Sequence, residues 1–339
     1  MKKLRIGIIG AGRIGNVHAQ SLTYFIPQAE VAMITDPNEQ AAQRVAQAYG
    51  IPAWGPDYRT LLADPSIEAV LVCSPTPTHA DIAMAAMRAG KHVFCEKPVD
   101  LTLEKIRATA RVAQETGRKI QVGFNRRFDH NHGRVRQLAA SGALGQVEIV
   151  KITSRDPQPP SPEYAASSGG LYIDMMIHDF DMAMFLAGSD VREVYATGVS
   201  LVDPRIGEAG DVDTAIVTLS FENGALGVID NSRRAAYGYD QRVEVFGSLG
   251  MAAGENDGDT TVRLSTEAGV VSDKPQYFFL ERYMASFTEE LRQFVEVVVN
   301  DKPVPVGLHE GLMSVALAKA ARLSLDEHRP VRVREILEA

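Results

Sequence analysis

The stretch LRIGIIGAGRIG, residues 4–15, decides how the first part of this chain folds. A short apolar run leads into the segment from Gly10 to Gly15, which matches the pattern G-x-G-x-x-G, and residues 13–25 follow with a helical pattern. The pattern is specific only after a strand, before a helix and with an acidic residue further on. Asp36 stands 21 residues beyond Gly15, at the end of the next apolar run. The turn is therefore interpreted as a dinucleotide-binding turn rather than as a purely structural one.

Each glycine has a separate task in such a turn. Gly10 permits the tight turn, Gly12 lets the backbone approach a pyrophosphate, and Gly15 lets helix and strand pack closely. Backbone amides at the start of the helix then face the phosphates. A carboxylate at Asp36 accepts hydrogen bonds from the ribose 2′-hydroxyl of NAD and repels the 2′-phosphate of NADP. Because the next residues, Pro37 and Asn38, are not basic, the sequence favours NAD.

Strand and helix patterns alternate over the first 123 residues, which predicts one domain. Near-continuous apolar strands separated by amphipathic helices indicate a parallel sheet covered on both faces, the doubly wound Rossmann arrangement. The expected strands are 4–10, 30–36, 69–75, 91–98 and 118–124. The expected helices are 13–25, 37–50, 78–90 and 101–117, with Gly50 as a C-cap and Thr78 as an N-cap.

A different rhythm begins after Phe124, so residues 124–339 are predicted to form a second domain. Runs of β-forming residues joined by turns predict a mostly antiparallel sheet in an α+β domain. The expected strands are 146–157, 192–202, 213–221, 224–234 and 242–248. The expected helices are 128–145, 169–188, 281–300 and 308–327.

Composition and charge exclude several classes of protein. The 339 residues are 45% hydrophobic and 23% charged with a formal net charge of −8, and no long basic run is present. Nucleic acid is therefore not an expected partner, since phosphate binding needs clustered Lys or Arg. No apolar stretch approaches the ~20 residues that span a bilayer, so no membrane is expected. The two cysteines, Cys73 and Cys95, suit small core positions and a reducing cytoplasm rather than a disulfide framework.

Two loops follow strands at their carboxyl ends, where ligands bind in such sheets. Residues 73–79 form a proline-stiffened loop that is either a rigid crossover or a wall of the cofactor site. Lys97, in the tripeptide Glu-Lys-Pro at 96–98, has either a solvated ammonium or one that donates to a substrate oxygen. The candidate cofactor-binding residues are Gly10, Gly12, Arg13, Ile14, Gly15, Asp36, Ser74, Thr76, His79, Glu96 and Lys97.

The expected helix GGLYIDMMIHDFDMAMFLAG, residues 169–188, is apolar yet carries four groups that bind protons, namely Asp174, His178, Asp179 and Asp181. Asp174 and His178 are four residues apart, so they share a face of a helix. An imidazole beside a carboxylate has a fixed orientation and exchanges a proton near neutral pH. A helix cap or solvated face is one alternative. Half of a metal site is another, although no Cys/His cluster elsewhere completes it and no metal is expected.

Taken together, the turn at 10–15, the tripeptide at 96–98 and the Asp174–His178 spacing resemble the Gfo/Idh/MocA family of sugar and polyol oxidoreductases. Three longer stretches resemble its inositol 2-dehydrogenases: GFNRRFD at 123–129, ITSRDPQPP at 152–160 and the helix at 169–188. The stretch NSRRAAYGYDQRVEVFGS at 231–248 supports them. The resemblance covers most of the chain.

This resemblance implies residue roles. Lys97, Asp174 and His178 are the implied catalytic residues, with a cis bond before Pro98. The implied residues of the polyol pocket are Lys97, Arg127, Asp156, Asp174, His178 and Tyr237. The family also implies a homotetramer built through the sheet of the second domain.

The implied activity is NAD-dependent oxidation of a cyclic polyol that sits between the two domains. myo-Inositol would give 2-keto-myo-inositol (scyllo-inosose) by hydride transfer from carbon 2. The alternatives are scyllo-inositol or an aldose such as glucose as substrate, and a non-catalytic NAD-binding sensor.

Overall fold

The computed structural model describes residues 3–339. The chain forms two compact units. The N-terminal unit consists of residues up to 128 together with residues 285–312, and the C-terminal unit consists of residues 129–284 and 313–339. The chain therefore leaves the N-terminal unit, builds most of the second unit and returns before it ends.

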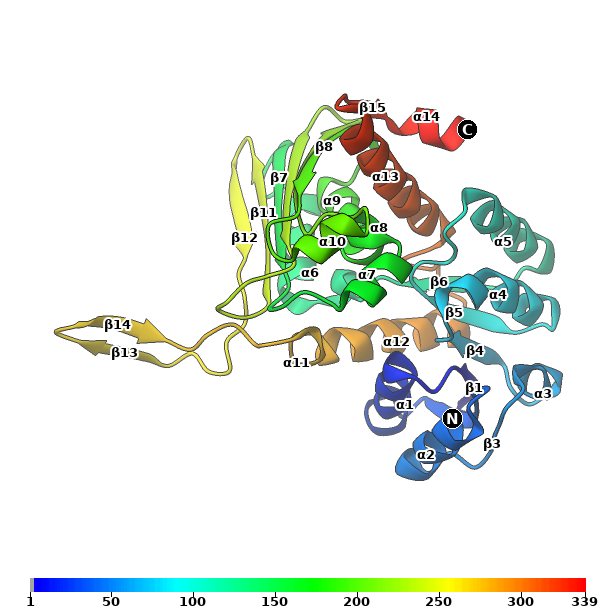
Figure 1. Ribbon diagram of the computed structural model, residues 1–339. Helices are drawn as coiled ribbons and strands as arrows, with labels where there is room; N and C mark the ends of the chain where they lie inside the picture. Colours follow the sequence, from blue (N-terminus) through cyan, green and yellow to red (C-terminus); the bar gives the residue numbers. More distant parts are fainter. Residues whose placement is uncertain (1–2) are drawn as a thin grey trace. The chain divides into compact units, whose positions relative to one another are not determined.

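Six parallel strands form the sheet of the N-terminal unit in the order β3-β2-β1-β4-β5-β6, which confirms the predicted doubly wound arrangement (Figure 1). The strands are β1 Leu4–Ile9, β2 Ala29–Thr35, β3 Trp54–Gly55, β4 Ala69–Val72, β5 His92–Glu96 and β6 Ile120–Gly123. The helices are α1 Arg13–Phe25, α2 Glu39–Tyr49, α3 Tyr58–Ala63, α4 His79–Arg88, α5 Leu103–Thr116 and α12 Met284–Val299, with short 3₁₀ turns η1 Thr76–Thr78 and η2 Asn125–Phe128.

Strand order reverses between β1 and β4, so the loops after these strands diverge and leave room for a ligand at the carboxyl ends. One core of this unit packs Ile6, Ile8 and Leu71 of the sheet against helix α12. Helix α12 contributes Phe294 and Leu291, both 0% exposed. Because an apolar helix face has to be buried, α12 belongs to this unit even though it follows the second sheet in sequence.

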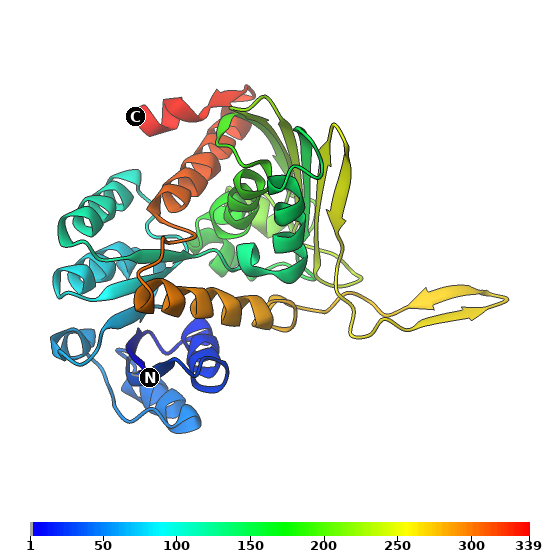
Figure 2. The same ribbon diagram turned by 180° about the vertical axis from the view of Figure 1, so that it is seen from behind.

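Seven strands form the sheet of the C-terminal unit in the order β12-β11-β7-β10-β9-β8-β15. Only the β7–β10 pair within this sheet is parallel, which confirms a mostly antiparallel α+β domain. The strands are β7 Val147–Arg155, β8 Val191–Val199, β9 Thr214–Phe221, β10 Leu226–Ser232, β11 Asp240–Gly247, β12 Gly250–Gly254 and β15 Val331–Arg332. A separate hairpin, β13 Arg263–Thr266 with β14 Gly269–Ser272, extends away from this sheet (Figures 1 and 2).

Helices cover one face of this seven-stranded sheet, as the two views in Figures 1 and 2 show. Strand β9 alternates between buried residues such as Val217 and exposed ones such as Ile216, so its two faces differ. The helices of the unit are α6 His130–Ala140, α7 Pro162–Ser167, α8 Gly170–Asp174, α9 Ile177–Ala187, α10 Pro204–Glu208, α11 Phe279–Arg282, α13 Leu308–Glu327 and α14 Val333–Glu338, and the first residues of α13 belong to the N-terminal unit.

The single helix predicted over residues 169–188 is wrong, because the chain breaks between α8 and α9. The amides of Met175 and Met176 both donate to the carbonyl of Leu171, at 3.1 and 2.9 Å, so the turn there is wider than an α-helical one. Asp174 ends α8 and His178 lies near the start of α9. Their spacing of four residues therefore does not put them on one face of a continuous helix.

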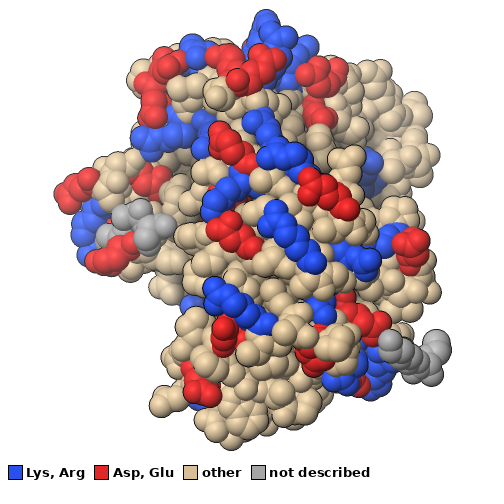
Figure 3. Space-filling model, turned by 90° about the vertical axis from the view of Figure 1, so that its right-hand side faces the viewer, with Lys and Arg blue, Asp and Glu red and all other residues tan. Residues whose placement is uncertain are grey.

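On the face shown in Figure 3, basic and acidic side chains are interspersed. Several arginines pair with nearby acids, for example Arg322 with Asp326 at 2.9 Å and Arg329 with Glu335 at 3.0 Å. Within residues 3–339, no helix has the length and apolar character required to cross a membrane.

Candidate active site

The glycine turn after β1 has the geometry that a dinucleotide requires. Gly10 has a φ of +104°, and a Cβ there would lie 2.5 Å from the carbonyl oxygen of Cys73. A Cβ on Gly15 would lie 2.0 Å from the carbonyl oxygen of Gly10, so only glycine allows α1 to pack this closely. At Gly12, by contrast, nothing lies within 4 Å of the Cβ position. The open side of the turn is therefore the side from which a pyrophosphate can approach.

The start of helix α1 offers donors to such a ligand. Gly12 is the N-cap, and no side chain caps this end of the helix. Arg13 and Ile14 stand in the first turn of α1. Their backbone N–H groups have no acceptor within the helix, because the first N–H groups of any α-helix have no carbonyl one turn before them. Together with the helix dipole, these amides make an anion site.

Asp36 is anchored beside the glycine turn. Its Oδ2 accepts the N–H of Ala11 at 2.8 Å, and its Oδ1 accepts the N–H of Asn38 at 2.8 Å. These bonds hold the carboxylate at the end of β2, half-buried. Each carboxylate oxygen accepts more than one hydrogen bond, so both retain capacity for a ribose hydroxyl.

The loop at residues 73–79 is tied together internally. The hydroxyl of Thr78 lies 2.7 Å from that of Ser74 and donates to the carbonyl of Pro75 at 2.7 Å. Thr78 is the N-cap residue of α4, as predicted, although its side chain makes no capping hydrogen bond to the helix. His79 is buried, and its Nδ1 lies 2.8 Å from the carbonyl of Pro98 and its Nε2 2.6 Å from that of Ser74. This ring therefore joins the loop after β4, which includes Thr76, to the loop after β5.

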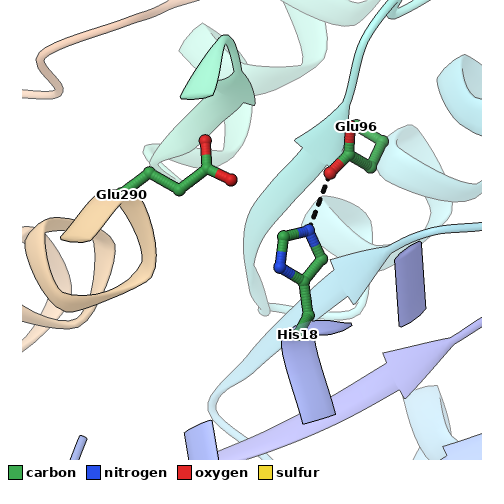
Figure 4. A group of neighbouring side chains, drawn as sticks. All are labelled: His18, Glu96 and Glu290. Carbon is green, nitrogen blue, oxygen red and sulfur yellow. Dashed lines mark hydrogen bonds and ion pairs between the residues drawn. The ribbon is translucent and has the colours of Figure 1, made fainter. Parts of the chain in front are cut away.

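Lys97 directly follows β5 and is half-buried. The Lys97–Pro98 bond is cis, as the resemblance implied. The N–H of Lys97 donates to Oε2 of Glu96 at 3.3 Å, while Oε1 of Glu96 lies 2.7 Å from Nε2 of His18. Glu96, predicted to contact the cofactor, is only 8% exposed and points toward His18 inside the unit (Figure 4).

Arg127 belongs to η2 in the same unit. Its Nη1 lies 3.8 Å from Oε1 of Glu310, and 9% of its side chain is exposed. The N-terminal unit thus carries the glycine turn, Asp36 and Lys97 on loops that follow parallel strands, with Arg127 shortly after β6.

In the C-terminal unit, a buried arginine joins two of the predicted acids. Arg233 is 4% exposed and donates from Nη2 to Oδ2 of Asp174 at 3.1 Å and from Nη1 to Oδ2 of Asp156 at 3.4 Å. The hydroxyl of Tyr164 donates to the other oxygen of Asp174 at 3.1 Å. Sequence reasoning did not assign a role to Arg233 or Tyr164. The available signal for Arg233 was its position in the stretch 231–248, which carried the family resemblance.

The other acids of the stretch 169–188 are buried in α9 rather than displayed on a polar face. Asp179 is 0% exposed and accepts a hydrogen bond from Nδ2 of Asn231 at 3.0 Å. Asp181 is 1% exposed. His178, one residue before Asp179, is half-buried. Most residues of α9 are buried, on all sides of the helix. Its apolar residues therefore do not form a single stripe along one face, as they would in a surface helix.

Tyr237 belongs to a neighbouring polar network. Its hydroxyl donates to Oδ2 of Asp240 at 2.5 Å and accepts from Nη1 of Arg155 at 3.1 Å. Arg155 also pairs with Asp230 at 2.6 Å. Burial, and then the bond to Asp240, raise the pKa of the Tyr237 hydroxyl above its ordinary value, so Tyr237 remains a neutral phenol at neutral pH.

Comparison with known proteins agrees with this geometry. Residues 4–124 match the Gfo/Idh/MocA oxidoreductase family with its NAD-binding Rossmann fold, and residues 132–253 match the C-terminal domain of the same family. The chain belongs to the Gfo/Idh/MocA family of oxidoreductases. Its N-terminal unit is an NAD-binding Rossmann domain of that family.

Three relatives illustrate the similarity. The chain is 46% identical to the myo-inositol 2-dehydrogenase of Thermotoga maritima, over 98% of this chain and 100% of that protein. It is 42% identical to the inositol 2-dehydrogenase of Rhizobium meliloti, over 97% of this chain and 99% of that one. The crystal structure of myo-inositol dehydrogenase from Lactobacillus casei, in complex with NAD(H) and myo-inositol, is similar at a TM-score of 0.88 and 26% identity, covering 97% of this chain and 96% of that one.

Proposed function

We propose that this protein is an NAD-dependent inositol 2-dehydrogenase that oxidises myo-inositol to 2-keto-myo-inositol. The observation that carries the proposal is the match over nearly the full chain to relatives named for that activity. The glycine turn, with open space at Gly12, supports NAD as the oxidant. We further propose that residues 1–123 bind the cofactor and residues 124–339 bind substrate and form the oligomer.

The proposed chemistry removes a hydride from carbon 2 and a proton from its hydroxyl. His178 accepts that proton as general base. Lys97 donates a hydrogen bond to the same oxygen and stabilises the negative charge that develops on it. Asp174 orients His178 and favours its imidazolium form. The bound nicotinamide supplies the hydride acceptor, so an alcohol becomes a ketone without any other oxidant.

The contacts of Arg233 support Asp174 in this role. A guanidinium with two acids at hydrogen-bond distance restricts both carboxylates to one orientation. We propose that Asp156, Arg127 and Tyr237, together with the catalytic residues, hold the remaining hydroxyl groups of the polyol. Carboxylates accept and guanidinium groups donate, which suits a ring of hydroxyls that do both.

For the cofactor, we propose that the pyrophosphate binds at Gly10, Gly12 and Gly15 and at the amides of Arg13 and Ile14. Asp36 receives the adenosine ribose and so selects NAD. The loops after β4 and β5 flank the rest of the cofactor, through Ser74, Thr76, His79, Glu96 and Lys97. His79 and Glu96 act through the loops that they hold, since their ring nitrogens and carboxylate oxygens bond within the protein.

A panel of substrates tests the proposal. The purified protein is given myo-inositol, scyllo-inositol or glucose with NAD or NADP, and formation of the reduced cofactor is followed by absorbance. We expect the highest kcat/KM for myo-inositol with NAD, and scyllo-inosose as the product identified by NMR. A higher kcat/KM for scyllo-inositol or glucose would show that the protein prefers one of the alternative substrates. No turnover with any member of the panel would favour a non-catalytic NAD-binding sensor.

We propose a homotetramer assembled through the open face of the seven-stranded sheet. Four apolar residues lie in a row across neighbouring strands of that sheet, where Met251 opposes Phe246, Phe246 opposes Ile149 and Ile149 opposes Leu226. Exposed fractions of 54%, 42% and 56% for Met251, Phe246 and Leu226 leave this row uncovered within one chain. An apolar strip of this kind is typical of an interface.

The oligomer is tested by replacing Phe246 with Asp and comparing Phe25→Asp, which changes an exposed phenylalanine of α1 outside that sheet. Sedimentation velocity should give a tetramer for the unmodified chain and smaller species for F246D. A monomeric unmodified chain would contradict the proposal.

We also propose a cytoplasmic location, which the free, buried thiols of Cys73 and Cys95 support.

A further inference from the structure

Behind the loop that carries Lys97, three titratable side chains meet inside the N-terminal unit. His18 comes from α1, Glu96 from the end of β5 and Glu290 from α12, and Figure 4 shows the three side chains turned toward one another. One nitrogen or oxygen atom from each residue lies within 4.8 Å of the others. His18 and Glu290 are both 0% exposed. The proposed reaction does not use any of these three side chains directly.

The hydrogen bonds of this trio satisfy one carboxyl group and not the other. Glu96 is bonded to His18 through Oε1 at 2.7 Å and to the N–H of Lys97 through Oε2 at 3.3 Å. Both carboxyl oxygens of Glu290, and Nδ1 of His18, have no hydrogen-bond partner among residues 3–339. An ionised carboxylate at Glu290 would therefore be a buried charge without a partner, which is among the costliest groups a protein can contain.

Within residues 3–339, the charge that acts on the carboxyl group of Glu290 is the negative charge of Glu96. The titratable side chains that face it are His18 from α1, Glu96 from β5 and Cys73 after β4. Gln121 from β6 donates to its backbone carbonyl at 3.0 Å rather than to its carboxyl group. Burial raises the pKa of the Cys73 thiol well above its ordinary value, so the thiol is neutral. Burial, and then the charge of Glu96, raise the pKa of Glu290 well above its ordinary value.

We propose that Glu290 is a neutral carboxylic acid that donates a hydrogen bond to Nδ1 of His18, keeps its proton, and so holds Lys97 in position through His18 and Glu96. The donors and acceptors then match along the whole chain of contacts. The O–H of Glu290 donates to Nδ1, the Nε2–H of His18 donates to Glu96, and Glu96 accepts the backbone N–H of Lys97. In this arrangement the side chain of Glu290 rotates to bring its O–H to hydrogen-bond distance from Nδ1, in a group whose facing atoms lie within 4.8 Å of one another.

The role in positioning Lys97 rests on the proposed function, whereas the protonation of Glu290 does not. His18, Glu96 and Glu290 are positioning residues, since they act through the backbone of Lys97. A proton at Glu290 leaves a single negative charge, on Glu96, and requires no added ion. If the trio instead held a divalent cation, metal analysis of the purified protein would find one ion per chain, which would overturn the proposal.

Infrared spectroscopy tests the protonation without any need for turnover. At neutral pH the unmodified protein should show the C=O stretching band of a protonated carboxylic acid, in a region where carboxylates and amides do not absorb. Glu290→Gln should remove this band. Glu296→Gln changes an exposed glutamate on the same helix, paired with Lys302, and should leave the band in place. Absence of the band in the unmodified protein, or its persistence in E290Q, would contradict the proposal.

The pH dependence of stability is a second, independent measurement. A carboxyl group whose pKa is raised on folding binds its proton more tightly in the folded state. Its contribution is fully present below the pKa of the unfolded chain, about 4.3, and is lost as pH rises toward the folded pKa. The Tm of the unmodified protein should therefore fall relative to that of E290Q as pH rises above about 5. A Tm difference that stays constant with pH would refute a protonated Glu290.

The link to Lys97 is tested by two substitutions at His18. His18→Leu removes the donor to Glu96, whereas His18→Gln retains an N–H near the position of Nε2. With the preferred polyol, H18L should lower kcat by about 10²-fold, the effect of a small displacement of a catalytic group. The affinity for NAD should change little, and H18Q should recover part of kcat. Equal kcat values for the two variants would refute the positioning role.

The two possible failures remain separable. If the unmodified protein turns over no polyol, the proposed function fails, and with it the role of the trio in positioning a catalytic lysine. The infrared band and the pH dependence of Tm still decide whether Glu290 is protonated. If turnover is normal but E290Q retains the infrared band, the inference fails while the proposed function stands.

Discussion

Arg233 and Asp174 form an ion pair in which Nη2 of the arginine donates to Oδ2 of the aspartate at 3.1 Å. The arginine directly follows β10, whereas the aspartate ends α8, 59 residues earlier in the chain. The same guanidinium reaches Asp156 at 3.4 Å. One buried side chain thus restrains two acids to which the family resemblance assigns contact with substrate.

Replacing Arg233 by Met should disturb both acids at once. Loss of one partner from a buried ion pair costs about 3–5 kcal/mol of unfolding free energy, because the remaining charges lose their compensation. We also expect kcat/KM for the polyol to fall while the affinity for NAD is retained. Urea unfolding, steady-state kinetics and NAD titration measure the three effects.

Two further substitutions make this experiment specific. Arg233→Lys keeps the charge but cannot bridge two carboxylates with a planar fork, so its activity should lie between those of R233M and the unmodified protein. Arg234→Met changes the exposed neighbour and should have little effect. If R233M and R234M lowered the unfolding free energy and kcat/KM equally, loss of the ion pair with Asp174 would not be the cause of these effects.

Asp36→Ala should change the preference between NAD and NADP. The variant loses an acceptor for the ribose hydroxyls and the charge that repels a 2′-phosphate. Hydrogen bonds to a charged group contribute about 1.5–3 kcal/mol, so NAD affinity should fall about 10-fold or more, and NADP affinity should fall less or rise. Titration with each cofactor gives the ratio. Asp57→Ala, at the start of α3, is the control, and an unchanged ratio in D36A would count against the assigned role.

Lys97→Met and His178→Ala should each lower kcat sharply. Loss of a general base typically costs ~10²–10⁴ in rate. NAD should still bind, because the glycine turn and Asp36 are intact in both variants. Steady-state and single-turnover kinetics measure the loss. Lys151→Met, which changes an exposed lysine on β7, serves as the control, and turnover near the normal value in K97M or H178A would remove that residue from the mechanism.

Asp129→Asn should destabilise the C-terminal unit mainly at neutral pH. Asp129 caps α6 through the amides of Asn131 and His132, both at 3.1 Å, and it pairs with Arg282 in the interior. Burial acts to raise the pKa of Asp129, but His132 and Arg282 outweigh it, and the pKa lies below its ordinary value. Asparagine keeps a capping oxygen and removes only the charge. We expect the unfolding free energy of D129N to be about 3 kcal/mol lower than that of the unmodified protein at pH 7.

The sign of the pH effect follows from that lowered pKa. A carboxylate with a depressed pKa contributes stability above the unfolded value of about 3.9, and this contribution disappears as pH falls through the folded pKa. The difference in unfolding free energy between D129N and the unmodified protein should therefore become smaller at acidic pH. Asp203→Asn removes a half-buried carboxylate that caps α10 and pairs with the exposed Arg205, and should change stability less than D129N does. A difference for D129N that is independent of pH would contradict this account.

The candidate site was only partly predictable from sequence. The glycine turn, Asp36 and Lys97 lie directly after strands, and position relative to a strand end is readable from local pattern. The partners of Asp174 were not predictable in the same way. Arg233 and Tyr164 reach it from separate segments, and nothing in the spacing along the chain relates these three residues. The neutral Glu290 was hidden for the same reason, because it lies 272 positions after His18 in the sequence.

By itself the sequence determined the alternation of strands and helices, the dinucleotide turn and the division between a parallel and a mostly antiparallel sheet. These features depend on periodicity and on glycine positions within short windows. Only the tertiary structure decided that α12 packs on the first sheet, that residues 169–188 form two helices, and that Arg233 lies between two acids. Each of these features depends on which segments, far apart in the sequence, pack together and bury apolar surface. Such burial outweighs the local preference of a segment for helix or strand.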